Sequence, residues 1–315
     1  MRAIGGYFEL EVKRGRHYHD NAIRLNTARN CFEYVLRVRD CRKVYVPFYT
    51  CEVMLEPIQK LGLDYEFYHI NEQLEPAILP ELGSDAVFLY TNYFGLKQNC
   101  VQKLSSLYGQ QLIVDNAQAF YDMPIEGIDT FYSARKFFGV ADGAYLYTIN
   151  PVFRDLERDC SYSRMSHLLK RLDLGAEEGF QDFRRNDDGL IGQDIKTMSN
   201  LTDALLSGVD YSGSRRKRRD NYHCLDRELA ESNRIRLALD DGAVPMVYPY
   251  LTDDSSLKKK LIDNRIYVAT YWPNVFAWCR PGDWEYKLAD RVVYLPVDQR
   301  YDQKDMERVI DIIHS

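Results

Sequence analysis

A short apolar run that ends in an acidic residue constrains the fold of this chain more than any other segment. Leu112-Ile-Val predicts a buried strand, and Asp115 follows it directly. Further along, Lys136 stands between the strand-like Thr130-Phe-Tyr-Ser and Gly139. A charge at the end of a buried strand is costly unless a partner of opposite charge satisfies it. The run therefore predicts an internal sheet with ionisable groups at one edge.

Strand-like and helix-like segments alternate through the first half of the chain. The expected strands are 43–46, 64–70, 86–90, 112–114, 128–133 and 144–148. The expected helices are 27–39, 52–61 and 101–108. This alternation predicts an α/β domain with a mostly parallel central sheet flanked by helices. In such sheets ligands gather at the carboxyl ends of the strands. Asp115, Ser133 and the turns at 47–51 and 92–95 would meet there.

The second half of the chain has a different texture. Residues 150–198 predict helices and an irregular loop, and a long helix is expected from Asn200 to Glu231. From about residue 236, short strands (244–251, 266–270 and 292–295) alternate with helices (256–264 and 303–313). We therefore expect a large domain over 1–235 and a small C-terminal α+β domain over 236–315.

Composition limits the class of protein. The 315 residues include 41 basic and 47 acidic side chains, a net charge of −6 that disfavours nucleic acid as a partner. The seven cysteines are odd in number and form no C-x-x-C pair, so neither a disulfide framework nor a zinc site is implied. The first residues have no charged-then-apolar signal pattern, and no window resembles a membrane span. We expect a soluble cytoplasmic protein.

The acid and the lysine together suit one cofactor, pyridoxal phosphate. Its ring nitrogen must stay protonated beside a carboxylate, so that the ring can withdraw electrons, and its aldehyde needs a lysine amine to form a Schiff base. Asp115 and Lys136 have the required chemistry. Each also has a simpler interpretation: Asp115 as a strand-end residue that caps a turn, and Lys136 as a surface lysine.

Six motifs in this order resemble the DegT-like sugar aminotransferases, pyridoxal-phosphate enzymes of the aspartate-aminotransferase fold. The resemblance runs from about residue 24 to 314. The motifs are Leu25-Asn-Thr-Ala-Arg, Val46-Pro-Phe-Tyr-Thr, Val114-Asp-Asn-Ala-Gln-Ala, Ser133-Ala-Arg-Lys-Phe-Phe-Gly-Val-Ala-Asp-Gly143, Asn200-Leu-Thr-Asp-Ala and Leu295-Pro-Val.

The resemblance implies roles for the residues of the central motifs. Lys136 would form the Schiff base and later move the proton between the substrate carbon and the cofactor. Asp115 would pair with the pyridinium nitrogen. Gln118 would donate its amide to the phenolic oxygen of the cofactor, although a simple turn hydrogen bond is the alternative.

Other residues would hold the cofactor phosphate. Thr27 and Ala28 begin a predicted helix, whose free N–H groups and dipole favour an anion. Ser133 would add a hydroxyl, and Arg135 would either add charge or face solvent. Asn200 matches a family position that reaches the phosphate across a dimer interface, which implies a homodimer with shared sites. Ordinary helix capping is the alternative for Thr27 and Asn200.

The chain departs from the family at the ring-stacking position. Relatives often place a large aromatic side chain there, whereas the matching residue here is Cys51. Tyr49 or Tyr93 would then supply the ring face. The chain is also short, and the turn Asp142-Gly143-Ala144 replaces a more glycine-rich pattern.

The implied function is an aminotransferase that moves an amino group, from glutamate by resemblance, to a keto group on a nucleotide-linked sugar, in polysaccharide or modified-sugar synthesis. Two alternatives stay open. One is a pyridoxal-phosphate sugar dehydratase, although relatives that eliminate carry histidine in place of the lysine. The other is a non-catalytic relative of the fold. The sequence contains neither a G-x-G-x-x-G nor a G-x-x-x-x-G-K motif, so it gives no indication of a plain nucleotide-binding protein.

Three further features have simpler interpretations. The basic run Arg215–Arg219 would form a solvated helix face more readily than a polyanion site. His17 and His19 resemble a metal pair but lack an apparent third ligand, so no metal site is expected. Trp272, Trp278 and Trp284 are expected to pack a core or line a substrate entrance.

Overall fold

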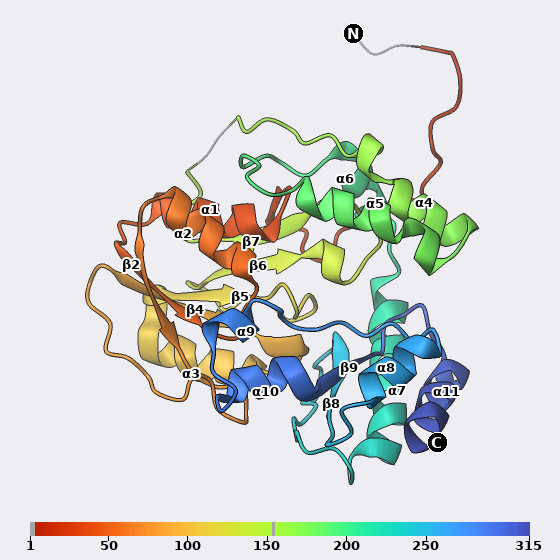
Figure 1. Cartoon of the computed structure of the whole chain (residues 1–315). Helices are drawn as coiled ribbons and strands as arrows, with labels where there is room; N and C mark the ends of the chain where they lie inside the picture. The colour runs from red at the N-terminus through yellow and green to blue at the C-terminus, as the bar shows by residue number, and fades with distance from the viewer. Residues whose placement is uncertain (1–3, 153–154) are drawn as a thin grey trace.

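The computed structural model describes residues 4–152 and 155–315, and its centre is a seven-stranded sheet (Figure 1). The strands stand in the order β1-β7-β6-β5-β4-β2-β3. Their bounds are β1 Ile23–Leu25, β2 Lys43–Pro47, β3 Asp64–Tyr68, β4 Ala86–Thr91, β5 Leu112–Asp115, β6 Asp129–Ser133 and β7 Ala144–Tyr147.

The strands from β2 to β6 are parallel to their neighbours, whereas β7 is antiparallel to both β6 and β1. Strands β4 and β5 are buried along their whole length. Such burial is typical of parallel strands that are covered on both faces. The expected mostly parallel sheet flanked by helices is confirmed.

Each face of the sheet has its own apolar core. Ile113 belongs to the core that includes side chains of α1 (Ala28–Val38) and α2 (Leu55–Lys60). Its neighbours Leu112 and Val114 belong to the opposite core, with side chains of α3 (Gln98–Tyr108) and α7 (Tyr211–Leu229). Successive side chains of a strand point to opposite faces, so one apolar run serves both cores.

A second, two-stranded antiparallel sheet is formed by β8 (Val247–Leu251) and β9 (Val292–Pro296). The C-terminal helix α11 packs against both α7 and α8. The helices of this part are α8 Leu257–Asp263, α9 Val275–Trp278, α10 Trp284–Arg291 and α11 Gln303–His314.

Two expectations for the second half are wrong. The predicted helix 200–231 is two helices, α6 (Asn200–Ser207) and α7, because Gly208 ends the first and the Asp210 side chain caps the second by accepting from Gly213 N at 2.9 Å. Residues 266–270 are not a strand, because β8 and β9 pair only with each other and this segment lies outside both sheets.

Residues 150–198, apart from 153 and 154, which lie outside the described residues, form helices and irregular segments as expected. Helices α4 (Ser166–Asp173) and α5 (Ala176–Asp188) pack side by side as a hairpin (Figure 1). Apolar side chains on this hairpin remain exposed, namely Leu169, Leu172, Leu174, Phe180 and Phe183.

Short 3-10 helices complete the secondary structure. They are η1 Glu52–Met54, η2 Tyr93–Gly95, η3 Gly109–Gln111, η4 Ala134–Lys136 and η5 Tyr162–Arg164. The longest helix in the described ranges, α7, has 19 residues and carries many charges. In residues 4–152 and 155–315, no helix has the length and apolar character needed to cross a bilayer.

Candidate active site

Asp115 ends β5 at the carboxyl edge of the central sheet, where only 5 % of the residue is exposed. Its Oδ1 accepts a hydrogen bond from Ala117 N at 2.8 Å. Burial raises the pKa of Asp115 to about 6, and the Ala117 N–H and the positive charge of Lys136 oppose that rise. No ion pair to this carboxylate forms among the described residues, so the site has a buried acid that suits a cationic partner.

Gln118 lies in the turn that follows Asp115, and it is 2 % exposed. Its Oε1 accepts from Phe94 N at 3.2 Å, which fixes the direction of the amide. Its Nε2 is buried and has no hydrogen-bond partner among the described residues. Since buried donors are almost always satisfied, this unpaired amide indicates a place for an acceptor that the chain itself does not supply.

The backbone that holds Gln118 is strained. Phe94 has φ 59° and Gly95 φ 71°, both left-handed, and a non-glycine residue pays for this conformation. A Cβ on Gly95 would lie 2.7 Å from Val244 O, so only glycine fits. The turn 92–95 therefore joins the sheet edge tightly to the segment that leads into β8.

Thr27 is the N-cap of α1, and its hydroxyl accepts from Asn30 N at 3.1 Å. Ala28 begins the helix, so its N–H is among those without an intrahelical acceptor. The apolar face of α1 packs on the sheet and fixes this helix end. The capping alternative is thus real for Thr27, and it coexists with the anion-binding geometry of a helix start.

Ser133 ends β6, and Lys136 ends the short helix η4 that follows. Lys136 is exposed, and its Nζ lies 5.8 Å from the centre of the Tyr271 ring. Lys136 has no ion-pair partner among the residues that the structure describes. Its amine is therefore accessible, next to an aromatic face at which a cation is favoured.

The turn Asp142–Gly143 ties three parts of this edge together, and sequence reasoning did not assign it a role. Gly143 O accepts from Ala134 N at 3.0 Å, and Gly143 N donates to Asn26 O at 2.6 Å. Asp142, fully buried, accepts from Ser199 N and Oγ at 2.8 Å each and from the Thr202 hydroxyl. In the sequence, the pair Asp142-Gly143 was the signal that could have indicated this turn. In the structure, Gly143 has φ 111°, a conformation that favours glycine.

The candidates for the ring face differ in burial and in their neighbours. Tyr49 and Tyr93 are fully buried and pack against each other, and the Tyr93 hydroxyl donates to Tyr49 O at 2.9 Å. Cys51 is half-buried and lies within electrostatic range of Lys136, whose charge opposes the rise in the pKa of the Cys51 thiol that burial causes. Tyr271, which was not singled out from the sequence, is the aromatic residue beside Lys136.

Two other candidates are bonded to side chains outside this group. Asn200 is exposed at the start of α6, where its Oδ1 accepts from Arg158 at 2.9 Å. Arg135 forms an ion pair with Asp187 of α5 at 2.7 Å. The Arg135 side chain is thus paired with an acid and is only partly exposed to solvent.

The expectation of a solvated basic run is wrong for Arg218, which is 1 % exposed. Its guanidinium lies 4.5 Å from the centre of the Phe137 ring and donates to Gln299 Oε1 at 2.9 Å and to Met246 O at 3.3 Å. Gln299 in turn donates to Phe137 O at 2.8 Å. Arg218 therefore supports the residue next to Lys136 from the side of the second sheet.

The remaining features form part of the core. His17 and His19 are buried, with His17 bonded to Tyr145 and His19 packed on Tyr132. Among the described residues, no group of three His, Cys, Asp or Glu side chains is placed to hold a metal ion. Trp272, Trp278 and Trp284 pack in or against the apolar cores.

A cavity of about 700 Å³ borders Lys136 on the side of the α4–α5 hairpin. Its lining includes Phe138, Leu172, Phe180 and Phe183, together with the cations Arg171 and Arg300. Asp115 and Gln118 do not line it. Lys136 thus stands between the buried polar groups of the sheet edge and an open, partly apolar space.

No family model and no curated protein matches this chain. Solved structures do. The sugar aminotransferase CalS13 from Micromonospora echinospora is 15 % identical with a TM-score of 0.60, over 93 % of this chain and 87 % of its own. A DegT DnrJ EryC1 StrS aminotransferase from Brucella abortus is 14 % identical at 0.60, over 93 % and 85 %. Spr1654 from Streptococcus pneumoniae, in its PLP form, is 15 % identical at 0.62, over 92 % and 85 %. The chain has the fold of these proteins.

Proposed function

We propose that this protein is a pyridoxal-phosphate-dependent aminotransferase that transfers an amino group, from glutamate, to a keto group on a nucleotide-linked sugar. One observation carries the proposal. At the carboxyl edge of the sheet lie a buried carboxylate with no ion pair among the described residues (Asp115) and a buried amide nitrogen without an acceptor (Gln118), and the exposed Lys136 is within electrostatic range of that carboxylate. The shared fold with a structure named as a sugar aminotransferase supports the substrate class.

The residues present fit pyridoxal phosphate. Asp115 would bind the protonated ring nitrogen, and Gln118 Nε2 would donate to the phenolic oxygen. Thr27, Ala28 and Ser133 would bind the phosphate with one helix start and two hydroxyls. Cys51 and Tyr271 lie near Lys136 and would border the ring. When bound, the cofactor supplies an aldehyde that takes up an amine and a ring that withdraws electrons from the substrate carbon.

Lys136 would do two jobs in this arrangement. Its amine would hold the cofactor through the aldehyde, and the same amine would serve as the group that moves a proton at the substrate carbon. Asp115 would hold the proton on the ring nitrogen, because a negative charge in a buried site stabilises a nearby positive one. The anchored turn Asp142–Gly143 keeps the lysine segment and the phosphate end in register.

We also infer a homodimer with two domains per chain. Support for the dimer comes from the exposed apolar side chains of α4 and α5 and from the exposed Asn200, which would reach the partner's phosphate. Support for domains over 1–235 and 236–315 comes from the two separate sheets. Polysaccharide or modified-sugar synthesis in the cytoplasm is the setting we propose. Sedimentation velocity of the purified protein would test the dimer.

The test is the visible spectrum of the purified protein with added pyridoxal phosphate, compared between wild type, Lys136→Ala and Lys304→Ala. We expect a yellow band in wild type and in Lys304→Ala, an exposed lysine on α11, and its loss in Lys136→Ala. Transfer of labelled nitrogen from glutamate to a keto nucleotide-sugar should fall about 10²–10⁴-fold in Lys136→Ala, the usual worth of a positioned acid–base group.

Two outcomes would contradict the proposal. A colourless wild type that does not bind added cofactor would favour the non-catalytic relative. A deoxygenated sugar product without nitrogen would favour the dehydratase.

A further inference from the structure

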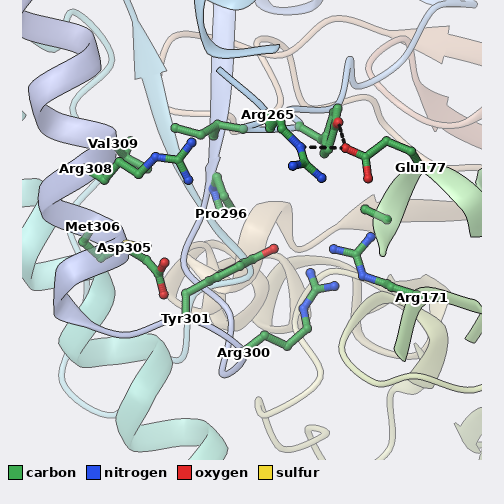
Figure 2. A pocket seen from close by; sticks show the side chains of 13 residues that line it. Arg171, Glu177, Arg265, Pro296, Arg300, Tyr301, Asp305, Met306, Arg308 and Val309 are labelled. Atoms are coloured by element: carbon green, nitrogen blue, oxygen red, sulfur yellow. Dashed lines mark hydrogen bonds and ion pairs between the residues drawn. The ribbon is translucent and has the colours of Figure 1, made fainter. Parts of the chain in front are cut away.

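A second cavity, of about 450 Å³, lies between the α4–α5 hairpin and the C-terminal part of the chain (Figure 2). Four segments contribute to its wall: the end of α4, the first turn of α5, the residues after α8, and the stretch from the β9 end into α11. None of the residues of the proposed cofactor site lines this cavity.

Four arginines from these segments line the cavity, namely Arg171, Arg265, Arg300 and Arg308. Figure 2 shows the guanidinium groups of Arg171 and Arg300 close to each other, with the Tyr301 hydroxyl extending into the same space. Among the described residues, two carboxylates, Glu177 and Asp305, belong to the lining, so positive charge is in excess. Such convergence costs energy unless an anion offsets it.

The arginines retain unused hydrogen-bond donors. Arg171 has no hydrogen-bond or ion-pair partner within residues 4–152 and 155–315. Arg265 uses its Nε to bond Glu177 at 2.9 Å, and Arg308 donates to Asn264 O at 2.6 Å. Arg300 is paired with Asp298 through Nε and one terminal nitrogen, at 2.7 and 2.8 Å. Even with Asp298 counted, one positive charge remains in excess.

Glu177 acts as an internal competitor for these donors. Its carboxylate accepts from Arg265 and from the Tyr267 hydroxyl, and both contacts lower its pKa to about 2. Glu177 is therefore ionised at neutral pH and occupies one guanidinium and one hydroxyl. An external anion that displaced it would gain both donors.

The cavity adjoins the larger one that borders Lys136. Arg171, Ala176 and Arg300 line both spaces. A ligand whose anionic group lies among the arginines would therefore extend toward the amine of Lys136, or would bind beside it as a separate molecule.

We propose that the arginine cavity binds a phosphate-bearing ligand, with Arg171, Arg265 and Arg300 around the phosphate oxygens and Tyr301 as a further donor. Planar guanidinium forks match the tetrahedral oxygens of phosphate and hold more than one oxygen at a time. The site stands without the proposed transamination. The phosphate would belong either to the substrate processed at Lys136 or to a separate effector.

The test is calorimetric titration of inorganic pyrophosphate into protein saturated with pyridoxal phosphate, so that the phosphate site at Thr27 is already filled. Arg171→Ala should weaken binding by about five- to tenfold, because a charge-assisted contact is lost at an exposed site. Glu177→Gln should strengthen it about two- to fivefold, because a competing charge is removed. Arg184→Ala, an exposed arginine on α5 outside both cavities, should have no effect.

Absence of pyrophosphate binding, or binding that Arg171→Ala and Glu177→Gln both leave unchanged, would overturn the site. The gain in pyrophosphate affinity expected for Glu177→Gln distinguishes a specific site from general damage to the fold, because a damaged fold would not bind more tightly. If pyrophosphate raises KM for the keto substrate at constant kcat, the phosphate belongs to the substrate; if it binds without raising KM, it belongs to an effector. Protein that binds pyrophosphate but no pyridoxal phosphate would overturn the proposed function alone.

Discussion

The carboxyl edge of the central sheet and the α4–α5 hairpin flank Lys136, yet they are built by opposite means. At the sheet edge, Asp115, Gln118 and Asp142 are buried and held by hydrogen bonds to the main chain or to neighbouring hydroxyls. On the hairpin, apolar side chains and arginines face solvent, and few of them are fixed by a buried partner. We call Asp115, Gln118 and Asp142 the polar frame. It is held in place by buried hydrogen bonds, whereas the surface of the hairpin is free to contact a ligand or a second chain.

The burial of the frame has an energetic consequence that the hairpin lacks. Removing a buried hydrogen-bonding group leaves its partners unsatisfied, whereas changing an exposed side chain usually costs little. Substitutions in the two regions should therefore differ in size, and those in the frame should affect both stability and cofactor binding.

Asp142→Ala should have the largest effect. Three donors, from Ser199 and Thr202, would lose their acceptor in a fully buried position, and unfolding free energy should fall by about 3–4 kcal/mol. Urea denaturation would measure the loss. Asp188→Ala, at the exposed end of α5, is the matched control and should stay within about 0.5 kcal/mol of wild type. Equal losses in both variants would erase the contrast between frame and hairpin.

Asp115→Asn should change stability in the opposite direction. The folded pKa of Asp115, about 6, lies above its ordinary value of 3.8, so the ionised acid destabilises the fold of protein freed of cofactor. This cost is absent below pH 4, develops as the pH rises toward 6, and is complete above it. At pH 7.5 the variant freed of cofactor should be more stable by about 2–3 kcal/mol.

The same substitution should weaken the binding of pyridoxal phosphate, because Asn offers no negative charge to the ring nitrogen. Thermal denaturation from pH 4 to 8, with and without cofactor, would reveal both effects. A variant that is less stable than wild type at every pH would show that the Asp115 carboxylate already has a cationic partner within the chain.

Leu172→Ser should have the smallest effect on the monomer. This side chain is 85 % exposed on α4, so unfolding free energy should change by less than about 0.5 kcal/mol. If the hairpin packs against a second copy, sedimentation equilibrium should show a weaker dimer in the variant. A loss above 2 kcal/mol in dilute, monomeric protein would instead place Leu172 inside the fold and remove the contrast.

Much of the frame could be predicted because its signals are local. The consecutive apolar residues Leu112-Ile-Val indicate a strand that is buried on both faces. The charged residue Asp115, which comes next, indicates where this strand ends. The cap at Thr27 is equally local, since a hydroxyl three residues before a free N–H defines a helix start. These features need no knowledge of what lies opposite.

The rest depends on segments that are distant in the sequence. Arg218 stands in a run of basic residues, and it is buried through contacts with distant residues, among them the carbonyl groups of 245 and 246, Gln299 and the ring of Phe137. Likewise, Tyr271, which lies beside Lys136, follows residues 266–270, whose composition favours a strand although they join neither sheet. The arginine cavity is invisible in the sequence because its members come from four segments.

The turn at Asp142–Gly143 joins the start of α1 and the segment before Lys136 through a single residue, Gly143. One main-chain hydrogen bond runs from Gly143 to Asn26, beside Thr27, and another joins Gly143 to Ala134, two residues before Lys136. Because Gly143 is bonded to both segments, a displacement elsewhere in the sheet does not change the position of one relative to the other. Motions of the outer strands, or insertions in the loops that connect them, would displace the start of α1 and the segment before Lys136 together. The distance between these two segments would stay unchanged.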